Sequence, residues 1–167
     1  MLKSHQDFPK KGILFYDIFP LFQHPNLVEE VVDFIAKELS ELDIDAIAAL
    51  DARGFLLGPW IAAKLKVPFY PIRKKGKLPG PTLSISSSKE YGKDVLEIQK
   101  DDIEGKGLKF LLFDDLLATG GSLKAAEELL TMTGNTVNAV YCMLELKSLA
   151  GREKLTCSKV NALLELP

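Results

Sequence analysis

Short apolar runs alternate along this chain with segments of helical periodicity, and this alternation is the feature that most restricts its fold. Apolar runs typical of strands buried on both faces of a sheet lie at residues 44–50 and 109–113, and further strand candidates lie at 67–72, 137–146 and 160–166. Apolar residues at helical spacing occur between them, at 27–39, 56–66 and 123–130. Strands joined through helices need crossover connections, so we predict an α/β fold with a mostly parallel, twisted sheet flanked by helices.

Capping residues predict where two of the helices begin or end. Asn26 precedes the first helical stretch and Glu29 follows three residues later, so Asn26 is predicted as its N-cap. The third helix is predicted to stop at Gly134.

Composition places the chain among ordinary globular domains. It has 167 residues, 47% hydrophobic and 26% charged, which suits a single domain over residues 1–167 and excludes disordered or fibrous chains. The net charge of −2 gives no broad basic field for nucleic acid. Cys142 and Cys157 are predicted to be buried thiols, and no apolar stretch approaches the roughly 18 residues of a membrane span. We therefore expect a cytoplasmic protein that contacts neither membranes nor nucleic acid.

One segment, residues 74–107, breaks the alternation. It is rich in glycine, proline, serine and charged residues, with only weak strand signals at 82–86 and 95–99. Long insertions of this kind in compact domains are usually lids or disordered segments. Tyr91, Leu96 and Ile98 could pack against the rest of the protein, so the segment is predicted to be a lid over an active site.

The stretch from Phe110 to Ser122 carries the strongest chemical signal. An apolar strand runs into Asp114 and Asp115, and a loop of small residues then opens a helix. Gly120 and Gly121 permit close backbone approach, while Thr119, Ser122 and the free amides of the helix N-terminus can donate hydrogen bonds to a phosphate. The two carboxylates can accept hydrogen bonds from sugar hydroxyls. A phosphate site beside a diol site predicts a phosphorylated ribose as ligand.

Each of these features also has a plain structural interpretation. The glycine pair could be a turn, and the aspartates could cap the end of a strand. The cations at residues 73–77 could be a solvated surface, Phe15 could be a core residue, and Glu90 could lie in solvent. The ordered set after an apolar strand favours the functional interpretation of residues 114–122.

At this point the sequence resembles a known family. Residues 114–122 resemble the phosphoribosyl diphosphate signature of the type I phosphoribosyltransferases, and residues 116–119 resemble in particular the members that act on adenine. The segments at 7–15, 51–55, 72–80 and 90–92 resemble that group's base-binding segment, diphosphate loop and catalytic hood. The match extends in order from residue 7 to about residue 135.

The resemblance implies transfer of a phosphoribosyl group from phosphoribosyl diphosphate to adenine, which gives AMP and diphosphate. It also implies Mg²⁺ carried by the diphosphate without a dedicated set of protein ligands, and a homodimer. Residues 7–20 would form the base-binding segment, and residues 74–107 would form a flexible hood.

The resemblance also assigns roles to individual residues. Glu90 and Arg53 would be catalytic. The ribose 5-phosphate and its diol would be bound by Asp114, Asp115, Ala118, Thr119, Gly120, Gly121 and Ser122. The diphosphate would be bound by Asp51, Ala52, Arg53, Lys74, Lys77 and Tyr91, with a cis peptide between the first two. Adenine would lie between Phe15 and Leu116 and be recognised by backbone groups of Leu14 and Tyr16.

Two other functions stay open at this level. The first is the same reaction on another purine base, such as hypoxanthine, guanine or xanthine, and the N-terminal segment argues against it. The second is a regulator that senses phosphoribosyl diphosphate and binds nucleic acid, and the net charge argues against it.

Overall fold

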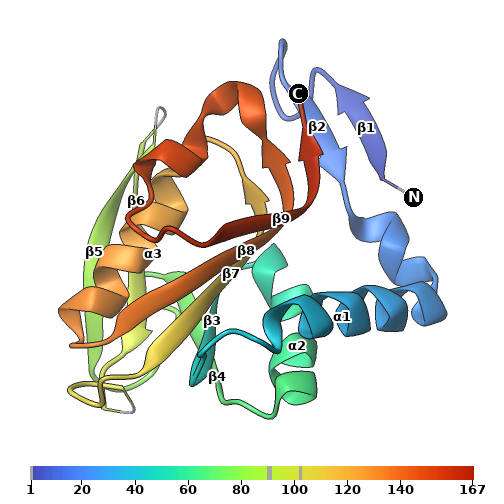
Figure 1. The fold of residues 1–167 in the computed structure, drawn as a ribbon. Helices are drawn as coiled ribbons and strands as arrows, with labels where there is room; N and C mark the ends of the chain where they lie inside the picture. Colours follow the sequence, from blue (N-terminus) through green and yellow to red (C-terminus); the bar gives the residue numbers. More distant parts are fainter. Residues whose placement is uncertain (1, 90–91, 102) are drawn as a thin grey trace.

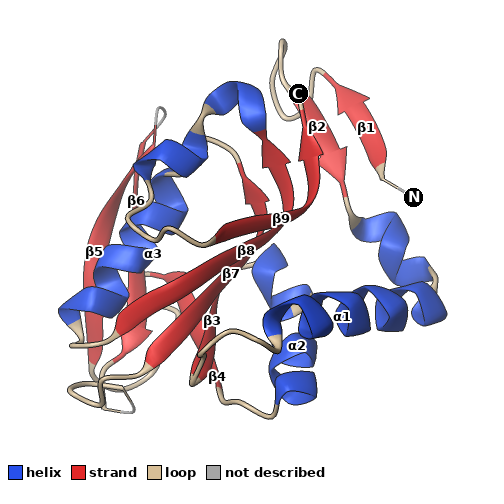
Figure 2. Cartoon of the chain, viewed as in Figure 1, coloured by secondary structure: helices blue, strands red, loops and turns tan. Residues whose placement is uncertain are grey.

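The computed structural model describes residues 2–89, 92–101 and 103–167. The strands in this part of the chain are β1 Lys3–Gln6, β2 Leu14–Asp17, β3 Ala46–Leu50, β4 Phe69–Lys74, β5 Thr82–Lys89, β6 Gly92–Gln99, β7 Lys109–Leu117, β8 Thr136–Leu146 and β9 Val160–Leu166 (Figures 1 and 2). The α-helices are α1 Pro25–Leu39, α2 Gly58–Leu65 and α3 Gly121–Met132. Short 3-10 helices are η1 Phe19–Gln23, η2 Arg53–Leu56, η3 Lys147–Leu149 and η4 Gly151–Lys154.

A seven-stranded sheet with the order β5-β6-β4-β3-β7-β8-β9 forms the centre of the fold. The five strands from β4 to β9 in that order are parallel to their neighbours, and β6 is antiparallel to both β4 and β5. This arrangement confirms the predicted α/β fold with a mostly parallel sheet.

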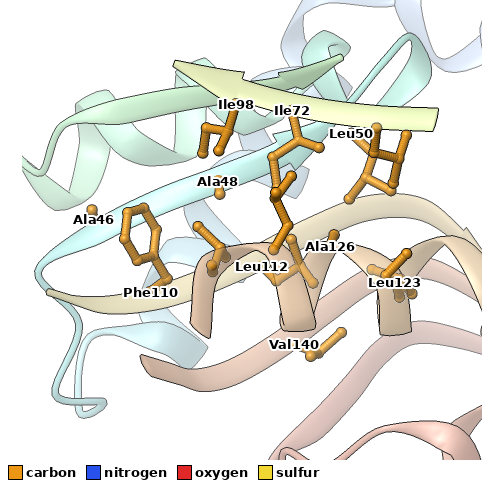
Figure 3. Close-up of a cluster of buried hydrophobic side chains, with 14 of the residues drawn as sticks. Ala46, Ala48, Leu50, Ile72, Ile98, Phe110, Leu112, Leu123, Ala126 and Val140 are labelled. Carbon is orange, nitrogen blue, oxygen red and sulfur yellow. The ribbon is translucent and has the colours of Figure 1, made fainter. Parts of the chain in front are cut away.

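The two faces of the sheet are buried under different helices. On β3, Ala46 and Ala48 face the cluster that contains α3, as Phe110 and Leu112 of β7 do (Figure 3). The intervening residues of β3 and β7 face the cluster that contains α1 and α2. Both faces of these strands are therefore buried, which explains why their sequences are continuously apolar rather than alternating.

The segment that interrupts the sequence pattern forms a β-hairpin, one of the two forms, loop or hairpin, expected of the hood. β5 and β6 pair over their whole length, and β6 pairs with β4 at Arg73↔Glu97 and Lys74↔Leu96. The sequence signals therefore underestimated the length of both strands, because β5 is paired by β6 and β6 by both β5 and β4, and the local sequence does not reveal these hydrogen bonds. Leu96 and Ile98 are buried, as predicted, in the cluster shared with α3.

Three local predictions were wrong. The first helix begins at Pro25, with His24 rather than Asn26 as its N-cap, because the fixed backbone angle of proline suits the first helical position. The strand predicted to end at Phe113 continues to Leu117, so Asp114 and Asp115 lie within it. Cys157 is partly exposed, whereas Cys142 is buried as predicted.

The N-terminal segment forms a separate small sheet. β1 and β2 pair antiparallel, with Gln6 opposite Leu14 and Ser4 opposite Tyr16. Figure 1 shows this hairpin beside the end of β9, which carries the C-terminus. In the parts of the chain that are described, no helix has the length and apolar character needed to cross a membrane.

Candidate active site

The candidate site lies where the direction of chain connection reverses in the sheet. β3 is flanked by β4 and β7, and the segments that follow β3 and β7 begin at the same edge because these strands are parallel. Ligands of open α/β sheets bind at such a reversal, outside the carboxyl ends of the strands. A cavity of about 440 Å³ lies there.

The cavity collects twelve of the residues that the sequence predicted as site residues. These are Asp51, Ala52, Arg53, Lys74, Asp114, Asp115, Leu116, Ala118, Thr119, Gly120, Gly121 and Ser122. Asp94 and Leu96 of β6 also line it. Segments separated by more than sixty positions in the sequence therefore meet at one cavity.

The loop after β7 has the backbone form expected of a phosphate cradle. Gly120 has φ +76°, and it is the N-cap of α3 with no side-chain capping bond. The first amides of a helix point toward its N-terminus and favour an anion there. Thr119 and Ser122 line the same cavity, so their hydroxyls are available beside these amides.

Asp114, Asp115 and Arg53 form a charged group within the cavity wall. The Asp115 amide donates to Asp114 Oδ1 over 2.9 Å, and Arg53 Nε lies 2.9 Å from Asp115 Oδ2. Burial raises the pKa of both carboxyls, the negative charge of Asp115 raises the pKa of Asp114 further, and Arg53 acts in the opposite direction on both. The pair therefore holds a proton more readily than two exposed aspartates would.

The residue after Arg53 has to be small. A Cβ at Gly54 would lie 3.2 Å from Asp114 Oδ1 and 3.2 Å from the Phe113 carbonyl oxygen. This tight packing brings the loop after β3 against β7. The peptide between Asp51 and Ala52 is cis, as the family resemblance predicted.

A second arginine holds the first residue of that loop. Arg73 Nε donates to Asp51 Oδ2 over 3.0 Å, and Arg73 Nη1 donates to the carbonyl oxygen of Lys77 over 3.2 Å. Lys74 lies 3.5 Å from Asp94 Oδ2 and lines the cavity, whereas Lys77 is exposed and is not among the lining residues. The cations at 73–77 therefore divide between the cavity and the surface.

The sequence analysis missed Glu97, whose carboxylate holds the backbone of the segment that follows β4. Its side chain is 3% exposed and accepts hydrogen bonds of 3.0 Å from the amides of Lys77 and Leu78. Burial alone would raise its pKa, but these backbone donors and the Thr82 hydroxyl bring the pKa of Glu97 below its usual value. A lone carboxylate between the apolar residues 96 and 98 gave no signal of this role.

Of the predicted adenine-binding residues, Leu116 lines the cavity, and Leu14, Phe15 and Tyr16 are not among its lining residues. The Phe15 ring lies 5.2 Å from the guanidinium carbon of Arg53. Leu14 and Tyr16 flank Phe15 on β2. Arg53 thus connects the N-terminal segment to the cavity.

The remaining predictions concern the hairpin tip and the metal. Glu90 and Tyr91 lie outside the described residues. Within the described residues, no group of three or more histidine, cysteine, aspartate or glutamate side chains is arranged to hold a metal ion.

The segment after β8 also reaches this site, and it too was missed. Gly151, the first residue of η4, packs against the backbone of Ala118 and Gly120. Because β8 is parallel to β7, its carboxyl end lies at the same edge, so the rule of searching after parallel strands could have found this contact.

Comparisons with known proteins agree with this geometry. The sequence profile of the phosphoribosyl transferase domain matches residues 20–153. An adenine phosphoribosyltransferase of Caenorhabditis elegans is 50% identical over 156 residues, covering 92% of this chain and 84% of its own length.

Two solved structures are also similar. The adenine phosphoribosyltransferase of Thermoanaerobacter pseudethanolicus superposes with a TM-score of 0.94 at 42% identity, covering 99% of this chain and 96% of its own. That of Saccharomyces cerevisiae, solved with adenine and an imino-altritol bisphosphate, gives a TM-score of 0.90 at 41% identity, covering 98% and 94%.

Proposed function

Because this chain belongs to the phosphoribosyltransferase family, we infer that it is an enzyme that transfers the phosphoribosyl group of 5-phospho-α-D-ribose 1-diphosphate to adenine. The products are AMP and diphosphate, so the reaction is a step of purine salvage. The observation that carries this inference is the cavity in which the loop 118–122, the Asp114–Asp115 pair and Arg53 meet.

The loop after β7 is proposed to bind the ribose 5-phosphate. Its helix N-terminus, the positive φ of Gly120 and the hydroxyls of Thr119 and Ser122 together suit a phosphate monoester. Asp114 and Asp115 precede this loop and would accept hydrogen bonds from the 2- and 3-hydroxyls of the ribose.

The opposite part of the cavity is proposed to bind the diphosphate. Arg53 and Lys74 are its cationic lining residues, and Asp51 and Ala52 line the cavity as well. We assign Lys77 and Tyr91 to the same group as residues of the hood, residues 74–107, which would cover the bound substrate and exclude water.

We propose that Mg²⁺ enters with the diphosphate. Asp51, Asp94 and Asp115, which line the cavity, are paired with Arg73, Lys74 and Arg53 respectively, so the ion would be held mainly by the oxygens of the diphosphate, as Mg²⁺ commonly is. When bound, magnesium would neutralise charge on the diphosphate and orient it as a leaving group.

Transfer breaks the bond between the anomeric carbon and the diphosphate oxygen and forms a bond from that carbon to a ring nitrogen of adenine. The anomeric carbon becomes cationic as in glycoside cleavage, so the site has to stabilise a cation and a departing polyanion together. Arg53 is proposed to stabilise the leaving diphosphate. Glu90 is proposed to take the proton that adenine loses from its other imidazole nitrogen.

The β2 strand is proposed to recognise the base. Adenine would stack between Phe15 and Leu116, and the backbone of Leu14 and Tyr16 would pair with its edge. A backbone carbonyl accepts from the amino group of adenine and an amide donates to a ring nitrogen, whereas a 6-oxopurine presents the reverse pattern. Such pairing would reject hypoxanthine and guanine.

We also propose a homodimer of single-domain subunits in the cytoplasm. Cys142 and Cys157 are both free thiols, which suits a reducing compartment. Sedimentation equilibrium tests the dimer, and a mass equal to one subunit would contradict it.

The function is tested by measuring diphosphate release from phosphoribosyl diphosphate and Mg²⁺ with adenine, hypoxanthine, guanine or xanthine offered separately. A control without base measures hydrolysis. Release with adenine alone is expected. Equal release with an oxopurine would contradict the assignment of the base, and no release with any base would favour a sensor over an enzyme.

A further inference from the structure

The loop proposed to bind the 5-phosphate rests on a second glycine from a different part of the fold. A Cβ at Gly151 would lie 2.0 Å from the carbonyl oxygen of Ala118 and 2.7 Å from the amide nitrogen of Gly120. A Cβ at Gly120 would lie 2.3 Å from the carbonyl oxygen of Gly151. The two backbones are therefore packed together with no room for a side chain on either.

The segment that carries Gly151 is fastened to the end of the sheet. Arg152 Nε donates to Glu145 Oε1 over 3.0 Å, a second guanidinium nitrogen pairs with Glu145 Oε2, and a third donates to the carbonyl oxygen of Val160. Glu145 is 3% exposed and the Arg152 side chain is 40% exposed, so this fork-to-fork pair is half-buried. Arg152 thereby connects η4 to Glu145 near the end of β8 and to Val160, the first residue of β9.

We propose that Gly151 and the Arg152–Glu145 pair are positioning residues for the 5-phosphate loop. This inference rests on the proposed role of residues 118–122. The backbone of Gly151 packs against Ala118 and Gly120 and thereby fixes the position of the phosphate-binding amides in the cavity. Arg152 and Glu145 in turn fix the position of Gly151 relative to β8.

The physical reason is that phosphate binding tolerates only small displacements of the backbone amides that donate to it. An alanine at residue 151 has to separate the two backbones by about 1 Å to reach an ordinary contact distance. Hydrogen bonds from backbone amides to phosphate oxygens weaken steeply with distance and angle. The diphosphate loop, residues 51–53, contains neither Ala118 nor Gly120, so a shift of the phosphate loop should leave diphosphate binding nearly intact.

The test compares two inhibitors that report on the two halves of the cavity, one a fragment of the phosphoribosyl donor and the other a product of the reaction. Ribose 5-phosphate carries the 5-phosphate, and inorganic diphosphate occupies the other half. For Gly151→Ala we expect the inhibition constant of ribose 5-phosphate to rise about tenfold, because loss of about one hydrogen bond to the phosphate has an effect of this size. The inhibition constant of diphosphate should change less than about twofold, and KM for phosphoribosyl diphosphate should rise more than kcat falls.

A matched control separates positioning from general stability. Gly134 has φ +79° and lies in the turn between α3 and β8, and a Cβ there would meet only Gly105, at 3.5 Å. Gly134→Ala strains the fold without touching the loop, so it should lower the melting temperature and leave both inhibition constants unchanged. Arg152→Lys keeps the charge but loses the fork, and it should move the ribose 5-phosphate constant in the same direction as Gly151→Ala.

The outcomes test two assignments separately: the positioning role of Gly151 and Arg152, and the binding of the 5-phosphate by residues 118–122. Ser122→Ala serves as the variant within the phosphate loop itself. If Ser122→Ala weakens ribose 5-phosphate and neither Gly151→Ala nor Arg152→Lys does, the positioning role is wrong and the phosphate loop stands. If none of the three variants weakens it while adenine transfer persists, both assignments are wrong. Should Gly151→Ala fail to fold, the Arg152→Lys result alone decides the positioning role.

Discussion

The guanidinium of Arg53 lies 2.9 Å from the carboxylate of Asp115, and this contact joins the loop after β3 to the strand β7. The same guanidinium lies over the ring of Phe15. One side chain thus contacts the proposed ribose-binding carboxylates and the proposed base-binding segment, while it lines the cavity proposed for the diphosphate.

Arg53→Lys should therefore lower the efficiency with which the enzyme uses both substrates. Lysine keeps the charge but lacks the planar fork that can contact a carboxylate, a phosphate and a ring at once. We expect kcat/KM for phosphoribosyl diphosphate to fall by about a hundredfold, as when one transition-state donor is removed. Steady-state kinetics with each substrate varied would measure this, and a change smaller than about threefold would exclude a catalytic role.

Replacing both Asp114 and Asp115 with asparagine tests the diol assignment. Asparagine keeps the shape but offers a weaker, neutral acceptor to the ribose hydroxyls. The dissociation constant for phosphoribosyl diphosphate should rise by about tenfold or more, while the melting temperature falls by less than about 3 °C. Calorimetric titration and thermal unfolding measure the two quantities. Loss of the fold would instead support a structural role for the pair.

The raised pKa of Asp114 makes a prediction about pH. Below the unfolded-state value of about 3.8 the carboxyl is protonated in both states and contributes nothing. As the pH rises above that value, the folded state retains the proton longer than the unfolded state, so this group lowers stability until its raised folded-state pKa is passed. Asp114→Asn should thus be increasingly more stable than the parent as the pH rises above about 4. Denaturant unfolding at several pH values measures this, and a constant difference would contradict it.

Glu97 should show the opposite pH dependence. Its folded-state pKa lies below the usual 4.5, so its contribution to stability is present above that pH and is lost as the pH falls through the lowered value. Glu97→Gln should lose about 1 kcal/mol at neutral pH, because its carboxylate accepts two backbone hydrogen bonds. Glu104→Gln, at a side chain that is mostly exposed, is the control. Equal effects of the two variants would argue against an organising role for Glu97.

Phe15→Leu tests base stacking. Stacking of a base on an aromatic ring contributes about 1–3 kcal/mol, so KM for adenine should rise by about tenfold. Phe34→Leu changes an exposed phenylalanine of α1 and should leave that value unchanged. Steady-state kinetics at saturating phosphoribosyl diphosphate measures the difference, and an unchanged KM for Phe15→Leu would assign this ring to packing alone.

The sequence was sufficient for the features that depend on neighbouring residues. The apolar runs at β3 and β7 predicted strands buried on both faces, since such strands have no polar face to show, and the runs at β8 and β9 predicted two further strands. Residues 114–122 predicted a phosphate and diol site, because the carboxylates and the glycines belong to one continuous segment. The family resemblance then assigned Arg53 to the same site.

Features that depend on distant residues were not predictable. β5 and β6 are longer than their weak sequence signals predicted, because the two strands pair with each other and β6 also pairs with β4. Glu97 looked like any surface glutamate until the amides of Lys77 and Leu78 were brought to it. Gly151 looked like an ordinary turn residue until the fold placed its backbone against Gly120.

The sequence by itself therefore determined the alternation of strands and helices in the parallel part of the sheet, the family and the chemical types of the ligand-binding groups. Only the tertiary structure decided which of those groups share one cavity, which side chain holds each loop, and which residue has no room for a Cβ. The physical reason is that periodicity and turn chemistry act over a few neighbouring residues. Close packing and shielded charge pairs act between segments that only the completed sheet brings together.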